Sequence, residues 1–149
     1  MSITTDRPAP AAGHTVALDP VHHGLVDPAG GSRDLDAMLD EAREAEREGA
    51  ATVVVPAAEA TAPRARHWPA TAQALAVLLA TTRVRVVVPI RPDAWEIDAV
   101  ARFATSASGL AGDRLVVHVR GAGAEVFARA LRQRWSGTLL VGDEAAVAA

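Results

Sequence analysis

The sequence predicts an α/β fold in which parallel strands alternate with helices. Short β-branched runs recur along the chain. Each run is followed by a segment in which Ala, Leu and Val have helical spacing, and Gly or Pro separates the run from that segment. The clearest example is the stretch from Val84 to Gly121, which contains a strand, a helix and a second strand. Because parallel neighbours need a long crossover, this βαβ unit predicts a parallel sheet.

Within that unit, Val84 to Ile90 is an almost continuous β-branched run, typical of a strand covered on both faces. Asp93 is the predicted N-cap of the helix that follows. The apolar face of this helix comprises Ile97, Val100, Ala101, Ala104 and Ala107. Gly109 and Gly112 are predicted to end the helix, and Leu115 to Val119 forms the second strand.

The N-terminal segment begins with residues rich in Pro, Ala and Thr, from Met1 to Gly13, which predict a flexible tail. Residues 14–149 are then expected to form a single domain. His14 to Leu18 is the predicted first strand. Asp19 to Ser32 is predicted to be a loop, because it holds two prolines and three glycines.

The first predicted helix is capped by Ser32 or Asp34 and runs to about Glu48, with Gly49 just past its end. Its apolar stripe comprises Leu35, Met38, Leu39, Ala42 and Ala45. The opposite face is densely charged and includes Glu46, which predicts a solvated surface.

Two more strands and two more helices complete the pattern. Thr52 to Pro56 is a strand, and a helix begins at Pro69, a favoured first residue, and runs to about Ala80. Its predicted inward residues are Ala72, Leu75, Ala76 and Leu79. Towards the C-terminus, Glu125 to Trp135 is a helix and Thr138 to Val141 a fifth strand. The residues on one side of that helix are Phe127, Ala128, Leu131 and Trp135.

Two architectures fit this alternation. An open, doubly wound sheet suits five strands and 149 residues. A (β/α)8 barrel normally needs about 250 residues, so this chain would supply about half of one. Periodicity alone does not choose between them.

Composition excludes several classes of function. The chain has no cysteine and no tyrosine, which removes thiolate metal sites, cysteine nucleophiles and phenolic acids or bases. Its net charge of -3 gives no electrostatic reason to expect nucleic acid or an anionic membrane. No apolar run approaches the length of a spanning helix, and the N-terminus lacks the apolar core of a signal peptide. A cytoplasmic protein is therefore expected.

The candidate ligand-binding residues lie where strands end. Arg91 suits a phosphate or sulfonate but is equally consistent with a structural ion pair. His118 points to a ligand or into packing, depending on register, and packing is favoured. Arg120 and Gly121 open a turn before a helix that suits an anion, the alternative being a simple βα turn. No metal-binding or nucleophilic motif is present, so no catalytic residue is assigned.

Several short phrases occur in a fixed order along residues 14–122. They are Gly31-Ser32-Arg33, Thr82 to Arg85, Ile90-Arg91-Pro92, Val100 to Thr105 and Leu110 to Val119. In this order and spacing they resemble the luciferase-like, flavin-dependent monooxygenases, most closely the alkanesulfonate monooxygenase branch. Each phrase is weak alone, and their joint order carries the resemblance.

The resemblance implies part of a TIM barrel that binds reduced FMN and oxidises a small organic substrate, such as a sulfonate, with a flavin peroxide. A flavin reductase would be the partner that supplies the cofactor. His118, Arg120 and Gly121 fall where the family flanks its flavin, and the Asn and Thr that the family carries there are absent. His22 and the basic loop that contains Arg66 are the corresponding substrate-binding candidates.

Half a barrel has an open strand at each edge, which invites pairing with another chain. The expected assembly is therefore a homodimer or a hetero-oligomer. The alternative function is a degenerate, non-catalytic relative that acts as a binding module, since the later half of the family's barrel has no counterpart.

Overall fold

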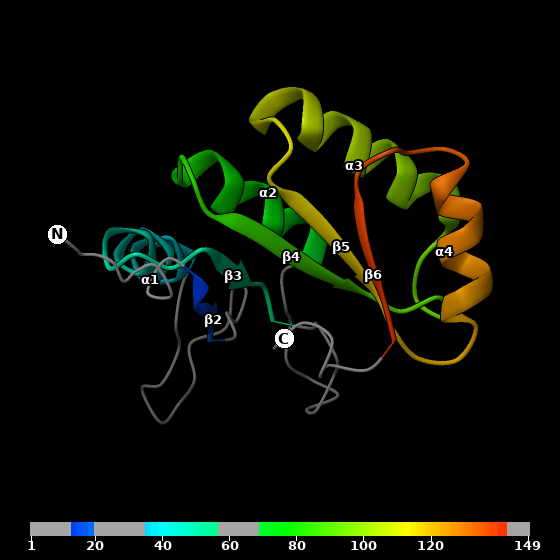
Figure 1. Ribbon diagram of the computed structural model, residues 1–149, viewed down its shortest axis with the longest axis horizontal. Coiled ribbons are helices and arrows are strands. Elements are labelled where there is room, and N and C mark those ends of the chain that lie inside the picture. Colours follow the sequence, from blue (N-terminus) through cyan, green and yellow to red (C-terminus); the bar gives the residue numbers. More distant parts are fainter. Residues whose placement is uncertain (1–12, 20–34, 57–68, 143–149) are drawn as a thin grey trace, which may run out of the picture.

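A computed structural model describes residues 13–19, 35–56 and 69–142 of the chain (Figure 1). The predicted order of strands and helices is confirmed. The elements are β2 (Thr15–Ala17), α1 (Leu35–Arg47), β3 (Thr52–Val54), α2 (Ala70–Ala80), β4 (Arg85–Ile90), α3 (Ile97–Ala111), β5 (Leu115–Val119), α4 (Ala124–Arg132) and β6 (Thr138–Val141). Within the described ranges, no helix is long and apolar enough to cross a bilayer.

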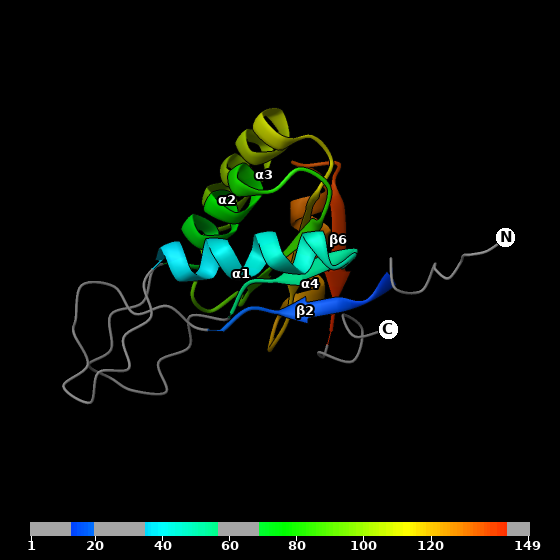
Figure 2. The ribbon, with the colours of Figure 1, turned by 90° about the vertical axis from the view of Figure 1, so that its left-hand side faces the viewer.

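The five strands form one parallel sheet in sequential order, β2-β3-β4-β5-β6. A doubly wound sheet reverses its strand order at a switch point, and this order contains no reversal. The open doubly wound alternative is therefore wrong. Sequential parallel strands with right-handed crossovers place the helices on one side, as in a barrel wall. Figures 1 and 2 show the helices gathered along one side of the strands.

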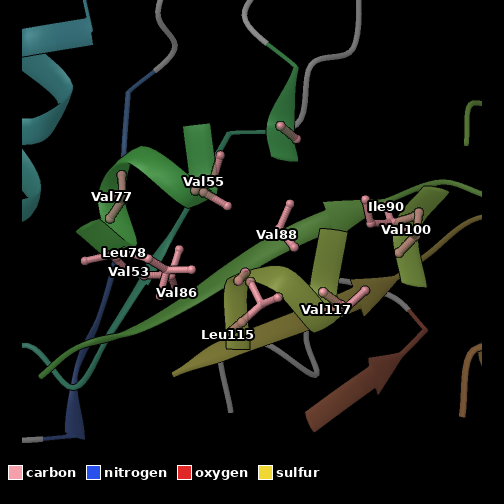
Figure 3. Close-up of a cluster of buried hydrophobic side chains, with 14 of the residues drawn as sticks. Val53, Val55, Val77, Leu78, Val86, Val88, Ile90, Val100, Leu115 and Val117 are labelled. Atoms are coloured by element: carbon pink, nitrogen blue, oxygen red, sulfur yellow. The ribbon is translucent and has the colours of Figure 1, made fainter. Parts of the chain in front are cut away.

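Alternate residues of the strands divide the sheet into two faces. One face packs into a single apolar core with all four helices, through Met38 of α1, Leu78 of α2, Val100 of α3 and Leu131 of α4. The strand residues in that core are Val53, Val86, Val88, Ile90, Leu115, Val117 and Val119 (Figure 3). The opposite face carries Val87, Val116 and His118, which are also buried. Strands buried on both faces explain the continuous β-branched runs.

Two predictions about α3 are wrong. The helix begins at Ile97, with Glu96 as its N-cap, and Asp93 instead bonds the Arg91 side chain. Gly109 does not end the helix, which continues to Ala111 and stops at Gly112, where φ is 73°. A left-handed residue of this kind is the usual place for glycine at a helix end.

The predicted inward face of α2 is also wrong. The residues buried against the sheet are Ala70, Gln73, Ala74, Val77 and Leu78. Leu79, predicted to be inside, is 62% exposed. Both sides of this helix are apolar, so periodicity could not decide which side meets the sheet.

The amino-terminal edge of the sheet is held by two charged side chains. The Glu46 carboxylate accepts backbone N–H bonds from Thr82 at 3.1 Å, Arg83 at 2.6 Å and Val84 at 2.9 Å. Glu46 is half-buried, so the prediction that the charged face of α1 is only a solvated surface is wrong at this position. The carboxylate joins α1 to the turn that starts β4.

The second of these side chains is Arg114, just before β5. Its guanidinium donates to the carbonyl oxygens of Leu78 at 2.7 Å, Thr81 at 3.1 Å and Val84 at 3.1 Å. Its Nε donates to the carbonyl of Ala111 at 3.3 Å. One cation thus satisfies carbonyls at the ends of α2 and α3, which have no partner within their helices.

Candidate functional site

The opposite, carboxyl-terminal edge of the sheet gathers four of the predicted site residues. Arg91 directly follows β4, His118 lies near the end of β5, and Arg120 and Gly121 directly follow β5. The two segments are held together by the Arg120 N–H, which donates to the carbonyl of Ile90 at 3.0 Å. In parallel βα folds, binding sites lie at this edge.

His118 points to the face of the sheet away from the helices, between Pro89 of β4 and Leu140 of β6 in the strand register. It is 2% exposed, and its Nε2 lies 2.8 Å from the carbonyl oxygen of Gly142. Because a carbonyl only accepts, Nε2 carries a proton in this contact. The contact fixes the ring and leaves Nδ1 as the atom for any further interaction.

Arg91 is half-buried and forms a bidentate ion pair with Asp93, with Nε to Oδ1 and Nη2 to Oδ2 both at 3.2 Å. The hydrogen bond from Arg91 holds the pKa of the Asp93 carboxyl below its usual value. The alternative interpretation of Arg91, a structural ion pair, is therefore confirmed. Both side chains retain considerable exposure, 43% and 68%, so the pair is accessible and weakly held.

The guanidinium of Arg91 also lies over the turn after β5. A Cβ built on Gly121 would stand 3.8 Å from Arg91 Cζ, and φ of Gly121 is 91°. Gly123 is left-handed as well, with φ of 81°, and is the N-cap of α4. Backbone N–H groups at a helix N-terminus beside an arginine favour an anionic ligand.

The sheet face below this turn is apolar. Val87 and Val116 are neighbours in the register and are 2% and 4% exposed, and Pro89 lies beside His118. This face is therefore apolar apart from one fixed imidazole, and its valines are buried.

The remaining predictions fall outside this edge. His22, Arg66 and the proposed caps Ser32 and Asp34 lie outside the described residues. Among the residues that the structure describes, no group of His, Asp or Glu could hold a metal ion. Sequence reasoning missed the roles of Asp93 and of the Gly142 carbonyl. The role of Asp93 could have been predicted, because an aspartate two residues after an arginine can pair with it. The role of the Gly142 carbonyl could not, because every residue has a backbone carbonyl.

Comparisons with known proteins show the fold. No protein-family model matches the sequence, and no curated protein matches it. The EDTA monooxygenase EmoA from Chelativorans sp. BNC1 superposes on 83% of this chain, with a TM-score of 0.63 and 15% identity. The predicted α/β fold of parallel strands alternating with helices is confirmed, and part of this enzyme shares it. The apo form of MsnO8 superposes on 81% of the chain, with a TM-score of 0.55 and 21% identity.

The chain spans 38% of the length of EmoA and 37% of that of MsnO8. The similarity therefore concerns part of a larger fold, in agreement with the predicted partial barrel. Neither name refers to an alkanesulfonate, so that branch assignment stays a prediction.

Proposed function

We propose that the chain binds reduced FMN at the carboxyl edge of β4 and β5 and acts as an FMNH2-dependent monooxygenase of the luciferase-like kind. The observation that supports this most directly is the position of the Arg91 guanidinium over the Gly121 turn, at the edge where βα folds bind ligands. The shared fold with an enzyme named as a monooxygenase adds to it.

The phosphate of FMN fits the turn. Arg91 and Arg120 would supply the positive charge, and the backbone from Gly121 to Gly123 would approach the phosphate closely, since glycine has no side chain to obstruct it. Asp93 competes for Arg91, but an accessible ion pair contributes little, so a doubly charged phosphate can replace the carboxylate.

The ring system would lie against the apolar sheet face beside His118. Binding would have to expose Val87, Val116 and His118, which are at most 4% exposed in this structure. Bound FMNH2 would supply the activation of O2, while this chain would orient the ring and exclude water from one side of it. His118, held by the Gly142 carbonyl, would present Nδ1 as a fixed hydrogen-bonding atom.

The substrate we propose is a small organic anion. An alkanesulfonate is the prediction from the sequence phrases, and the name of EmoA adds aminopolycarboxylates as a second class. A flavin reductase would supply FMNH2. Two assays with a reductase present distinguish these substrate classes. They measure sulfite release from an alkanesulfonate and O2-dependent consumption of EDTA.

The decisive experiment is a titration of the purified chain with FMN and with riboflavin, under reducing and oxidising conditions. FMN should bind more tightly, because only FMN carries the phosphate. Arg91→Ala should abolish that preference. Arg85→Ala, an exposed arginine at the opposite end of the same strand, is the matched control and should keep it. If riboflavin and FMN bind equally, or neither binds, the proposed site is wrong.

A second candidate is a non-catalytic module that binds a flavin or another phosphate ligand. The absence of the Asn and Thr that the family carries beside its flavin supports it, since His118, Arg120 and Gly121 stand there instead. Phosphate-dependent binding without substrate-dependent O2 consumption would identify this function. Among the described strands, β2 and β6 each pair on one side only, so we propose that catalysis would need a partner chain.

A further inference from the structure

A polar cavity lies at the amino edge of the sheet, between the turn that leads into β5 and the turn that leads into β6. Figure 1 shows both turns at the same end of the sheet, opposite to the proposed flavin site. The cavity has a volume of about 350 Å³, at the lower end of the range for small-molecule sites. Its polar lining comprises three hydroxyls and one carboxylate, from Ser108, Ser136, Thr138 and Asp113. We call it the amino-edge cavity.

Trp135 and Gly137 shape one wall of the cavity. The indole of Trp135 is 7% exposed, and its N–H donates to the Ser108 hydroxyl at 3.2 Å. A Cβ on Gly137 would overlap the indole ring, so the absence of a side chain there leaves room for the ring. The wall is therefore fixed by contacts within the protein, and a ligand would meet a preformed site.

Asp113 is the one charged residue of the lining. It is exposed, and within the described part of the chain its carboxylate makes no hydrogen bond or ion pair. The hydroxyls of Ser136 and Thr138 are likewise exposed and have no hydrogen-bond partner among the described residues. Glu46 and Arg114 at the same edge are, by contrast, fully used in bonds to the backbone. The polar groups of the cavity are therefore open to a ligand.

We propose that the amino-edge cavity binds a small organic ammonium ion, such as a protonated primary amine. An ammonium group offers three N–H donors and no acceptor. The cavity complements it, because the Asp113 carboxylate only accepts hydrogen bonds and the oxygens of Ser136 and Thr138 can also accept them. A bond between an ammonium and a carboxylate is charge-assisted and roughly twice as strong as a neutral one.

The charge of the lining disfavours other classes of ligand. An anion would meet the Asp113 carboxylate without a cation in the lining to offset the repulsion. A neutral polyol could use the same hydroxyls but would leave the carboxylate without an opposite charge. This inference rests on neither flavin binding nor the similarity to monooxygenases.

A titration of the full chain with putrescine, followed by NMR, tests the proposal. The chain has three tryptophans, so the indole N–H signal of Trp135 can be identified by its absence in Trp135→Phe. Putrescine should shift this signal saturably, with a dissociation constant on the order of 1 mM. The matched neutral probe is 1,4-butanediol, which has a hydroxyl in place of each ammonium group. It should bind about tenfold more weakly, because it cannot form the charge-assisted bond.

Three variants locate the binding. Asp113→Asn should weaken putrescine binding about tenfold and leave 1,4-butanediol binding unchanged, since it removes the charge at nearly constant size. Thr138→Val, of similar shape but without the hydroxyl, should weaken putrescine binding a few-fold. Asp36→Asn is the matched control, because Asp36 is exposed on α1 and does not line the cavity, and it should leave binding unchanged.

Thermal melts check that the variants fold. The proposal is overturned if putrescine leaves the Trp135 signal unmoved, or if the diol binds as tightly as the diamine. It is also overturned if Asp113→Asn and Asp36→Asn weaken putrescine binding equally, since the attraction would then reflect only the net charge of the chain.

Discussion

The two edges of the sheet differ in how their polar groups are used. At the amino edge, Glu46 and Arg114 each make several hydrogen bonds to backbone groups that would otherwise lack partners. At the carboxyl edge, Arg91 pairs with an exposed carboxylate, and His118 contacts one carbonyl. The charges of Glu46 and Arg114 at the amino edge therefore stabilise the fold, whereas the carboxyl edge carries the flavin site that we propose. The same division holds in βα barrels generally.

The largest loss of stability should follow removal of Arg114. Arg114→Ala leaves the carbonyls of Leu78, Thr81 and Val84 without this donor and should lower the free energy of unfolding by about 3 kcal/mol. Urea denaturation measures it. Arg102→Ala, on the exposed side of α3, is the control and should change little. A loss below about 1 kcal/mol would mean that the amino edge is not held in this way.

A steric change at the same edge should have the next largest effect. A Cβ on Gly137 would overlap Cζ2 of Trp135, whose indole N–H donates to the Ser108 hydroxyl at 3.2 Å. Gly137→Ala should therefore displace the indole and cost about 2 kcal/mol. Gly109→Ala meets no atom within 4 Å and lies inside α3, so it should stabilise or be neutral. Thermal melts of the two variants, with tryptophan fluorescence, compare them directly.

The Glu46 carboxylate should give the amino edge a pH dependence. Burial raises its pKa, but the N–H bonds from Val84, Arg83 and Thr82 together outweigh that effect and hold the pKa below 4.5. A depressed pKa means that the stabilisation is fully present above that ordinary value and is lost as the pH falls through the folded value.

Glu46→Gln should therefore cost about 1 kcal/mol at neutral pH, a figure that allows for solvent screening at this half-buried site. The difference from wild type should shrink as the pH falls through the depressed folded pKa, measured by urea denaturation across pH. Glu48→Gln, exposed near the end of the same helix, should show no such difference. A Glu46→Gln penalty that stays constant down to acid pH would contradict the role of the charge.

The contrast between the edges also explains what the sequence could predict. The strands could be predicted from the β-branched runs. The buried face of α3 could be predicted from the helical spacing of Val100, Ala104 and Ala107. Glu46 meets partners 36 to 38 residues away, and no local pattern contains such a contact. The apolar face of α2 was misassigned because that helix has two apolar faces, and only the tertiary structure selects one.

Two of the phrases that carried the family resemblance contain residues of the amino edge. Thr82 to Arg85 contains the turn that Glu46 caps, and Leu110 to Val119 contains Arg114. These phrases specify how helices join strands, which is why they predicted the fold. Arg91 and His118 also lie within phrases of the resemblance, but a phrase does not say what a side chain binds, so their roles remain proposals.

The smallest change in stability should come from the carboxyl edge. Asp93→Asn removes an exposed carboxylate and should leave the melting temperature unchanged, because exposed ion pairs contribute little. The same change releases Arg91 from its competitor and should raise the affinity for FMN a few-fold, while riboflavin binding stays the same. Asp113→Asn, an exposed aspartate at the amino edge, is the control for net charge. If both variants raise FMN affinity equally, the gain reflects overall charge, and the phosphate does not bind specifically at the carboxyl edge.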